Sequence, residues 1–215
     1  MKIENLVFEG GGVKGIAYAG ALQALETCQV MNDVIRVAGT SAGAITAALV
    51  SLRYDAATIT KIVKNTDFKK FEDHWNPLKI PSQYGLYKGE FLLHFIESFV
   101  TGKGFKKDAT FQDLKDQNCR DLKLFSSDLN TKLPREFSFD KTPDVIVAEA
   151  VRASMSIPLF FRAWKFSNGI PNDHIYVDGG LTYNYPITAF DHNGIDHKTV
   201  GFHFGKMDQV NEPTD

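Results

Sequence analysis

The five residues Gly39-Thr40-Ser41-Ala42-Gly43 have the pattern Gly-x-Ser-x-Gly, which is typical of a serine nucleophile. An apolar run from Val34 to Ala38 precedes them and predicts a strand, and the alanine-rich run from Ala42 to Leu52 predicts a helix. Small neighbours permit the sharp turn that projects a serine hydroxyl at the head of that helix. Ser41 is therefore the candidate nucleophile, although a serine at this place is also an ordinary helix N-cap.

A second glycine-rich loop, Gly10-Gly11-Gly12-Val13-Lys14-Gly15, lies between an expected strand, Leu6 to Phe8, and an expected helix, about Ile16 to Thr27. Such a loop leaves backbone N–H groups bare at a helix N-terminus, where they can hold a pyrophosphate or the oxyanion of an ester under attack. Its spacing matches a dinucleotide-binding loop, but that fold needs an acidic residue at the end of the second strand. The sequence has Gly39-Thr40-Ser41 there, and a phosphate-binding P-loop is disfavoured because Ile16 follows Gly15.

Asp178 is the candidate general base. It ends an apolar strand, Ile175 to Val177, and precedes Gly179-Gly180, so it lies at the carboxyl edge of the expected sheet, where ligands bind in open α/β folds. An aspartate before glycine is also a common turn residue. A Ser-Asp-His triad stays open as an alternative, with four histidines late in the chain: His174, His192, His197 and His203.

The elements that must position these residues predict an α/β fold with a mostly parallel sheet covered on both faces. Beyond the first two strand–helix pairs, we expect a strand over Leu122 to Leu129 paired across a turn at Pro134 with Glu136 to Phe139. A helix is expected over Val145 to Met155 and a last strand over Thr199 to Phe204, followed by a frayed tail from 208 to 215.

Residues 53–115 differ in character, because they combine phenylalanines with lysines and read as short helices. Residues 53–107 hold ten Lys or Arg against six Asp or Glu, a net +4, whereas the rest of the chain has 14 against 20, a net −6. We interpret this segment as a helical cap with its own core. The alternative is that it also faces a lipid surface, through Lys61, Lys64, Lys69, Lys70, Lys103, Lys106 and Lys107.

Composition limits the remaining possibilities. A chain of 215 residues predicts one domain, 1–215, large enough to need no disulfide or metal. Two cysteines favour a reducing compartment, and 24 basic against 26 acidic residues disfavour nucleic acid as a partner. The chain shows no signal-peptide layout and no apolar run of the roughly 18–20 residues that cross a bilayer, so we expect a cytoplasmic protein. We also expect neither a metal nor a cofactor.

Three motifs together resemble those of the patatin-like phospholipase family: GGGVKG at 10–15, GTSAG at 39–43 and DGG at 178–180. Two further segments agree with that family, Ala153 to Pro158 and Asn184-Tyr185-Pro186. The resemblance covers about residues 4–205. It implies a three-layer α/β/α fold in which the helical cap, residues 53–115, is variable, and a Ser-Asp dyad without a catalytic histidine.

Carried onto this chain, the resemblance makes Ser41 the nucleophile and Asp178 the base, with oxyanion-hole amides from Gly11, Gly12 and Val13. Lys14 matches the basic position of the family's glycine loop, where we favour a carboxylate partner or a loop-capping role. Supporting positions are Gly10, Gly15, Gly39, Gly43 and Gly179.

The expected reaction is hydrolysis of a fatty-acyl ester through an acyl-enzyme. An ordinary aspartate has a pKa of about 3.9, so proton transfer from Ser41 must be concerted with attack. The resemblance favours phospholipid, while other acylglycerols and galactolipid stay open, and Leu159-Phe160-Phe161 with the aromatic 68–105 segment is the expected acyl trough. The alternatives are a Ser-Asp-His esterase on other esters, a dinucleotide-binding module and a non-catalytic lipid binder. The oligomeric state stays open.

Overall fold

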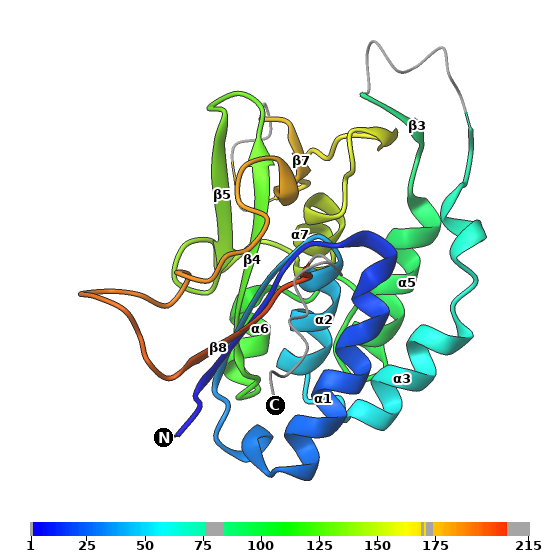
Figure 1. The fold of residues 1–215 in the computed structure, drawn as a ribbon. Helices are drawn as coiled ribbons and strands as arrows, with labels where there is room; N and C mark the ends of the chain where they lie inside the picture. The colour runs from blue at the N-terminus through cyan, green and yellow to red at the C-terminus, as the bar shows by residue number, and fades with distance from the viewer. Residues whose placement is uncertain (1, 76–83, 169, 171–173, 206–215) are drawn as a thin grey trace.

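The structure, a computed structural model, describes residues 2–75, 84–168, 170 and 174–205, and a six-stranded sheet lies at its centre (Figure 1). The strand order is β5-β4-β2-β1-β8, and β7 pairs with β4 outside this path. The strands are β1 (Asn5–Phe8), β2 (Arg36–Thr40), β4 (Asp121–Asp128), β5 (Leu133–Ser138), β7 (Tyr176–Asp178) and β8 (Thr199–Phe202).

Strand β4 has two partners on the same edge, and this places the ends of β2 and β7 against each other. β2 runs parallel to the first part of β4, with Thr40 opposite Phe125. β7 runs antiparallel to the last part, with Asp178 opposite Ser126. The other edge of β4 is occupied by the antiparallel strand β5. The C-terminal ends of β2 and β7 therefore meet at neighbouring rungs of one ladder.

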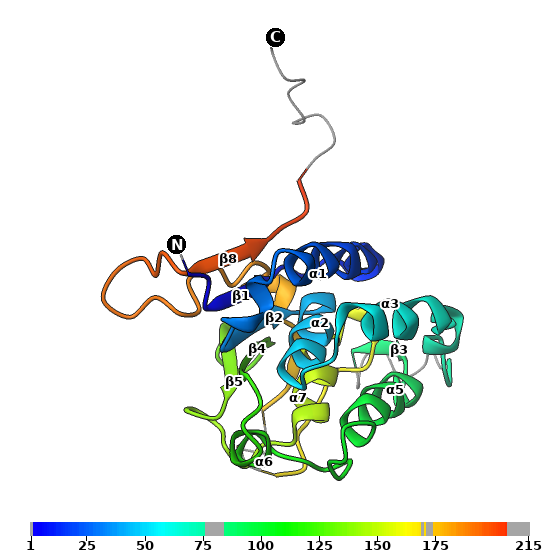
Figure 2. The same ribbon diagram turned by 90° about the horizontal axis from the view of Figure 1, so that it is seen from below.

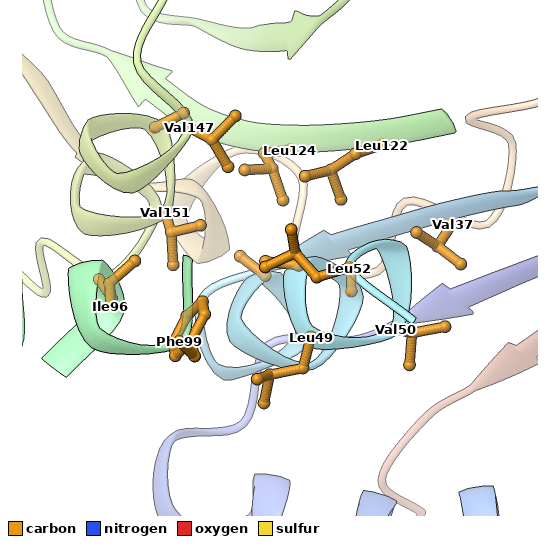
Figure 3. Close-up of a cluster of buried hydrophobic side chains, with 14 of the residues drawn as sticks. Val37, Leu49, Val50, Leu52, Ile96, Phe99, Leu122, Leu124, Val147 and Val151 are labelled. Atoms are coloured by element: carbon orange, nitrogen blue, oxygen red, sulfur yellow. The ribbon is translucent and has the colours of Figure 1, made fainter. Parts of the chain in front are cut away.

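Helices cover one face of the sheet (Figure 2). They are α1 (Ala17–Thr27), which follows the 3₁₀ turn η1 (Gly12–Ile16), together with α2 (Ala42–Ser51) and α7 (Val147–Ser154). Helix α2 is buried almost throughout, and a Cβ at Gly43 would overlap the carbonyl group of Phe8, so glycine lets this helix lie close to β1. Figure 3 shows part of the core on this face, where Leu52, directly after α2, lies toward Leu122 and Leu124 of β4, while Leu49 of α2 points away from that strand.

The opposite face of the sheet is covered by an irregular segment, residues 182–191, in which the structure shows no helix. Val7, Ala38 and Phe125 pack there against Phe190. The side chains alternate along β1, because Leu6 and Phe8 join the helical side. The predicted α/β fold with a mostly parallel sheet is confirmed, and its third layer in the described residues is this loop segment.

The segment between α2 and β4 packs into the main core instead of forming its own, so that expectation was wrong. It contains α3 (Ala56–Asn65), the 3₁₀ turn η3 (Phe68–Phe71), β3 (Gly85–Tyr87), α5 (Glu90–Thr101) and α6 (Phe111–Asp116). Leu92, Ile96 and Phe99 of α5 belong to the same buried cluster as the central sheet. No sequence pattern indicated that β3 pairs in parallel with β6 (Leu159–Phe161), and Gly85 permits this pairing because a Cβ there would overlap the Phe161 carbonyl.

Two further expectations differ from the structure. The β4–β5 turn lies at residues 129–132, and Pro134 sits inside β5 opposite Ser127, which is possible because β5 is an edge strand. The second strand begins later than predicted and continues to Thr40. The expected frayed tail lies outside the described residues. Across those residues, each helix is too short or too polar to traverse a bilayer.

Candidate active site

Ser41 sits at a strained turn between β2 and α2. Its φ of 54° and ψ of −125° lie in a region that residues with a side chain rarely adopt. A Cβ at Gly39 would overlap the Gly43 carbonyl, so the turn needs glycine where the motif has it. The serine is only 5% exposed and stands at the N-terminus of the buried helix α2.

The turn is held by a residue that sequence reasoning did not single out. The Ser41 N–H donates to Ser154 Oγ at 2.9 Å, and Ser154 Oγ donates to the Phe125 carbonyl at 2.6 Å. The Ser154 hydroxyl of α7 therefore links the backbone of Ser41 to strand β4. The motif from Ala153 to Pro158 marked this stretch, but no feature of it distinguished Ser154 from Ser156.

Asp178 reaches the serine directly, because Asp178 Oδ2 accepts a 2.6 Å hydrogen bond from Ser41 Oγ. The other carboxylate oxygen accepts a bond from the Gly180 N–H at 2.7 Å, and the Asp178 N–H donates to the Ser156 carbonyl at 2.9 Å. A Cβ at Gly179 would overlap the Phe125 carbonyl, so glycine allows β7 to turn away immediately after the aspartate. The shared edge of β4 thus brings the two predicted residues together.

Burial raises the pKa of Asp178 to about 6, while hydrogen bonds from Ser41 and Gly180 act in the opposite direction. The side chain is 6% exposed and has no cation bonded to it in the described part of the chain. The pKa of about 3.9 assumed from the sequence is therefore too low. A carboxylate with a pKa closer to neutral is a better proton acceptor for a hydroxyl.

Strand β1 delivers the glycine loop to the same place. A Cβ built on Gly10 would lie 3.0 Å from Ser41 Cβ, so the loop passes directly beside the serine. Among the residues described, the backbone N–H groups of 11, 12 and 13 have no acceptor, whereas the Gly10 N–H donates to the Asn184 carbonyl and the Lys14 N–H to the Gly11 carbonyl. Gly12 has a φ of +54°, which favours glycine. Three consecutive free donors beside Ser41 form a potential oxyanion hole.

The loop is held by a network that the sequence did not reveal. Asn184 Nδ2 donates to Glu9 Oε1 and to the Gly10 carbonyl, each at 3.1 Å. Glu9 Oε2 accepts from the Phe204 N–H at 2.6 Å. These contacts join the end of β1 to the segments on both sides of β8. The Lys14 side chain is exposed. The backbone N–H of Lys14 closes the loop by donating to the Gly11 carbonyl.

Histidine does not take part in this arrangement. All six histidines lie within the described residues, and none is hydrogen-bonded to Ser41 or Asp178; the second contact of Ser41 Oγ is Met155 Sδ at 3.8 Å. His174 instead bonds through Nδ1 to Asp128 Oδ2 at 2.7 Å. Within the same described ranges, no group of three or more His, Cys, Asp or Glu side chains is arranged to hold a metal ion.

An apolar cavity of about 410 Å³ opens beside the serine. Met155, which contacts Ser41 Oγ, lies in its wall, and the glycine loop contributes Gly12, Val13 and Gly15. Two predicted trough residues, Phe160 and Phe161, line it, but Leu159 points outward and is 64% exposed. The aromatic segment contributes Phe68, Phe71 and Phe95.

Arg152 is a buried cation behind the site that sequence reasoning missed. It is fully buried, and no carboxylate lies within ion-pair distance of it in the part of the chain that the structure describes. Burial lowers its pKa to about 10. Its guanidinium donates to Ser156 Oγ at 2.7 Å, and the Ser156 carbonyl in turn accepts the Asp178 N–H. Its other acceptors are the carbonyls of Lys88, Gly89 and Arg162.

Known proteins share this sequence and fold. The model of the patatin-like phospholipase family matches residues 6–191. An uncharacterized protein, YqhO of Bacillus subtilis, is 38% identical over 86% of this chain and 65% of its own length. An uncharacterized protein of Acanthamoeba polyphaga mimivirus is 31% identical over 99% of this chain and 69% of its own.

Among solved structures, VipD from Legionella pneumophila is similar with a TM-score of 0.70 and 18% identity, over 94% of this chain and 49% of that one. This likeness concerns the fold. The chain spans about two thirds of the length of the two relatives it matches. With the family model covering most of the described residues, the chain belongs to the patatin-like phospholipase family.

Proposed function

We propose that the chain hydrolyses fatty-acyl esters of phospholipids, in the manner of a phospholipase A, with Ser41 as nucleophile and Asp178 as the only side-chain base. The observation that carries this proposal is the 2.6 Å hydrogen bond from Ser41 Oγ to Asp178 Oδ2 in a buried site. A nucleophile and a base within hydrogen-bond reach are the first requirement of covalent catalysis.

In the first half-reaction, Ser41 Oγ attacks the ester carbonyl carbon while its proton passes to Asp178 Oδ2. The raised pKa of Asp178, about 6, favours this transfer compared with an ordinary aspartate. Negative charge develops on the carbonyl oxygen, and the free N–H groups of 11, 12 and 13 are the donors placed to receive it. As the C–O bond breaks, Asp178 returns the proton to the leaving alcohol.

In the second half-reaction, water takes the place of the alcohol. Asp178 accepts a proton from the water as its oxygen attacks the acyl carbon, and Ser41 Oγ leaves with that proton as a free hydroxyl. Atoms balance, because one ester and one water give one fatty acid and one alcohol. The Gly180 N–H holds Asp178 Oδ1 at 2.7 Å, so Oδ2 keeps facing Ser41 through both steps.

The acyl chain is the part of the substrate that the site accommodates best. The cavity beside Ser41 is apolar, and it has a volume of about 410 Å³, within the range of small-ligand pockets. Its walls come from the glycine loop, α2 and the aromatic segment, so an ester held at Ser41 has its chain directed between these elements. Phospholipid as the acyl donor follows the family to which the chain belongs.

Covalent labelling with a fluorophosphonate tests this proposal. We expect the wild-type protein to be labelled, Ser41→Ala to be unlabelled, and Ser98→Ala, which changes an exposed hydroxyl of α5, to be labelled like wild type. Analysis of fatty acids released from defined phospholipids then reports the acyl position. Labelling that persists in Ser41→Ala would show that another residue is the nucleophile.

A further inference from the structure

The mouth of the apolar cavity is surrounded by exposed apolar side chains. Val13 and Ile16 of the glycine loop region are 70% and 49% exposed, and both line the cavity. Phe68 and Ile157, also in its lining, are 39% and 37% exposed. Leu159 follows Ile157 and is 64% exposed. Several large apolar side chains gathered around one opening mark an interaction surface, whereas single exposed ones are ordinary. We call these five residues the apolar rim.

The backbone beside this rim is held in a conformation that turns an apolar side chain outward. Leu159 has a φ of 66° although it is a bulky residue in a strand, and such a conformation is strained. The Leu159 N–H donates to the Tyr84 carbonyl at 2.9 Å, and Tyr84 has a φ of 61° and is itself 43% exposed. The pairing of β3 with β6 therefore holds Leu159 and Tyr84 in these conformations with their side chains exposed.

Positive charge accompanies the rim. Lys14 lies between Val13 and Ile16 in the sequence and is exposed, and Lys69 follows Phe68 and lines the cavity. Lys70 is exposed on the same 3₁₀ turn. The 3₁₀ turn η3 lies in the segment 53–107 of net +4, although the chain as a whole has a net charge of −2. One exposed carboxylate, Glu72, also lines the cavity. Apolar groups flanked by lysines match a surface of apolar chains and anionic head groups.

We propose that the apolar rim docks onto an anionic phospholipid surface, so that an acyl chain enters the cavity from the lipid without passing through water. This inference rests on the proposed function, because it uses the cavity beside Ser41 as the acyl site. In this proposal the apolar rim, with the lysines beside it, is the lipid-facing surface in place of the broader set of lysines considered from the sequence. Lys103 and Lys106 line a separate polar cavity that also contains Arg53, Asp113 and Asp116, so they are not part of the rim.

Vesicle flotation with two rim-side variants tests the docking surface. Leu159→Asp and Tyr84→Asp place a carboxylate at positions that do not line the cavity. Ile35→Asp is the matched control: Ile35 is 53% exposed but precedes β2, at the end of the strand opposite Ser41. With phosphatidylglycerol-containing vesicles at low salt, we expect wild type and Ile35→Asp to bind alike and each rim-side variant to bind at least tenfold more weakly. Circular dichroism checks that each variant is folded.

Hydrolysis of a water-soluble short-chain ester separates this proposal from the proposed function. We expect Leu159→Asp and Tyr84→Asp to hydrolyse that ester like wild type while losing activity on vesicles. A wild-type protein that binds vesicles but does not hydrolyse the ester would count against the proposed function alone.

Three outcomes would overturn the docking proposal. One is binding of both rim-side variants at the wild-type level, and another is equal wild-type binding to neutral and anionic vesicles. The third is a wild-type dimer in light scattering that Leu159→Asp dissociates, because the rim would then join two copies of the chain.

Discussion

Two buried aspartates lie at nearby rungs of the same ladder, and their surroundings distinguish the proposed base, Asp178, from Asp128, which is bonded to a histidine. Asp178 is opposite Ser126 and Asp128 is opposite Tyr176, and the exposures of the two aspartates are 6% and 4%. The pKa of Asp178 is raised to about 6, whereas the pKa of Asp128 is lowered. Similar solvent exposure therefore accompanies opposite pKa shifts, and Asp178 is the more deeply buried of the two.

The difference comes from the deeper burial of Asp178 and from the donors around each carboxylate. For Asp128, burial alone would raise the pKa, but the His174 ring and the N–H groups of Asn130 and Thr131 together outweigh it. Asp178 has the Ser41 hydroxyl and one backbone N–H, and these do not compensate for its burial. A carboxylate with few donors keeps its affinity for a proton, which is what proton transfer requires.

Replacing each aspartate by asparagine gives the largest contrast in activity. We expect Asp178→Asn to lower kcat/KM by about 10³-fold, because an amide cannot accept the Ser41 proton. Asp128→Asn should stay within about threefold of wild type, since Asp128 has no contact with the serine in the described residues. Steady-state kinetics on a soluble ester measures both. Comparable losses in the two variants would remove the distinction between them.

At pH 8, the same two substitutions should change the free energy of unfolding in opposite directions. The folded-state pKa of Asp178 is above its unfolded value, so its favourable contribution exists below about pH 4 and is lost by about pH 6. At pH 8, Asp178→Asn should therefore raise the free energy of unfolding by up to roughly 3 kcal/mol, since each pKa unit is worth about 1.4 kcal/mol. At pH 4 we expect no such gain. Denaturant unfolding at both pH values gives the comparison.

Asp128→Asn should instead lower the free energy of unfolding at pH 8, by about 1–3 kcal/mol, because hydrogen bonds to a charged group are weakened. The pKa of Asp128 is lowered on folding, so its contribution is present above its unfolded pKa and disappears as the pH falls through its folded value. A more stable Asp128→Asn at pH 8 would show that His174 and the two backbone donors do not stabilise the carboxylate.

The pH dependence of the reaction sharpens the assignment of the base. Only ionised Asp178 accepts a proton, so kcat/KM should rise with pH and level off above a pKa of about 6. At pH 5 about a tenth of the carboxyl is ionised, which gives an expected rate about tenfold below that at pH 8. Asp128→Asn should leave this profile in place. A profile that is flat from pH 5 to pH 8 would exclude Asp178 as the titrating base.

The smallest expected effect tests the histidine alternative. His174→Ala should change kcat/KM by less than about twofold, because the ring bonds to Asp128 and not to the dyad. It should also lower the free energy of unfolding by about 1 kcal/mol, through the lost bond. His192→Ala is a control at a histidine with no bond to either dyad residue. A large loss of activity in His174→Ala would support a triad.

The strands and helices near the site could be predicted from the sequence because local residue patterns indicate them. Ser41 and Asp178 each follow an apolar strand and stand among glycines, and such motifs report on backbone geometry at a single turn. The contrast between Asp178 and Asp128 was not predictable, because it depends on His174, which is 46 residues from Asp128 along the chain.

Other contacts were hidden for the same reason. Ser154 supports Ser41 across 113 residues, and Arg152 meets Gly89 across 63. The pairing of β3 with β6 joins two three-residue strands, which are too short for an alternating pattern to identify. A buried arginine also goes against the usual preference of charged residues for the surface, so composition gave no reason to place Arg152 in the core.

The shared edge of β4 has a consequence for how this chain tolerates change. Ser41 and Asp178 are separated by 137 positions, yet consecutive rungs of one strand, Phe125 and Ser126, set the spacing between them. Insertions or deletions in the intervening surface loops need not alter that spacing as long as β4 keeps both of its partners. The surface loops of the aromatic segment can thus change in length without moving Ser41 relative to Asp178, whereas α5 is constrained by its place in the main core.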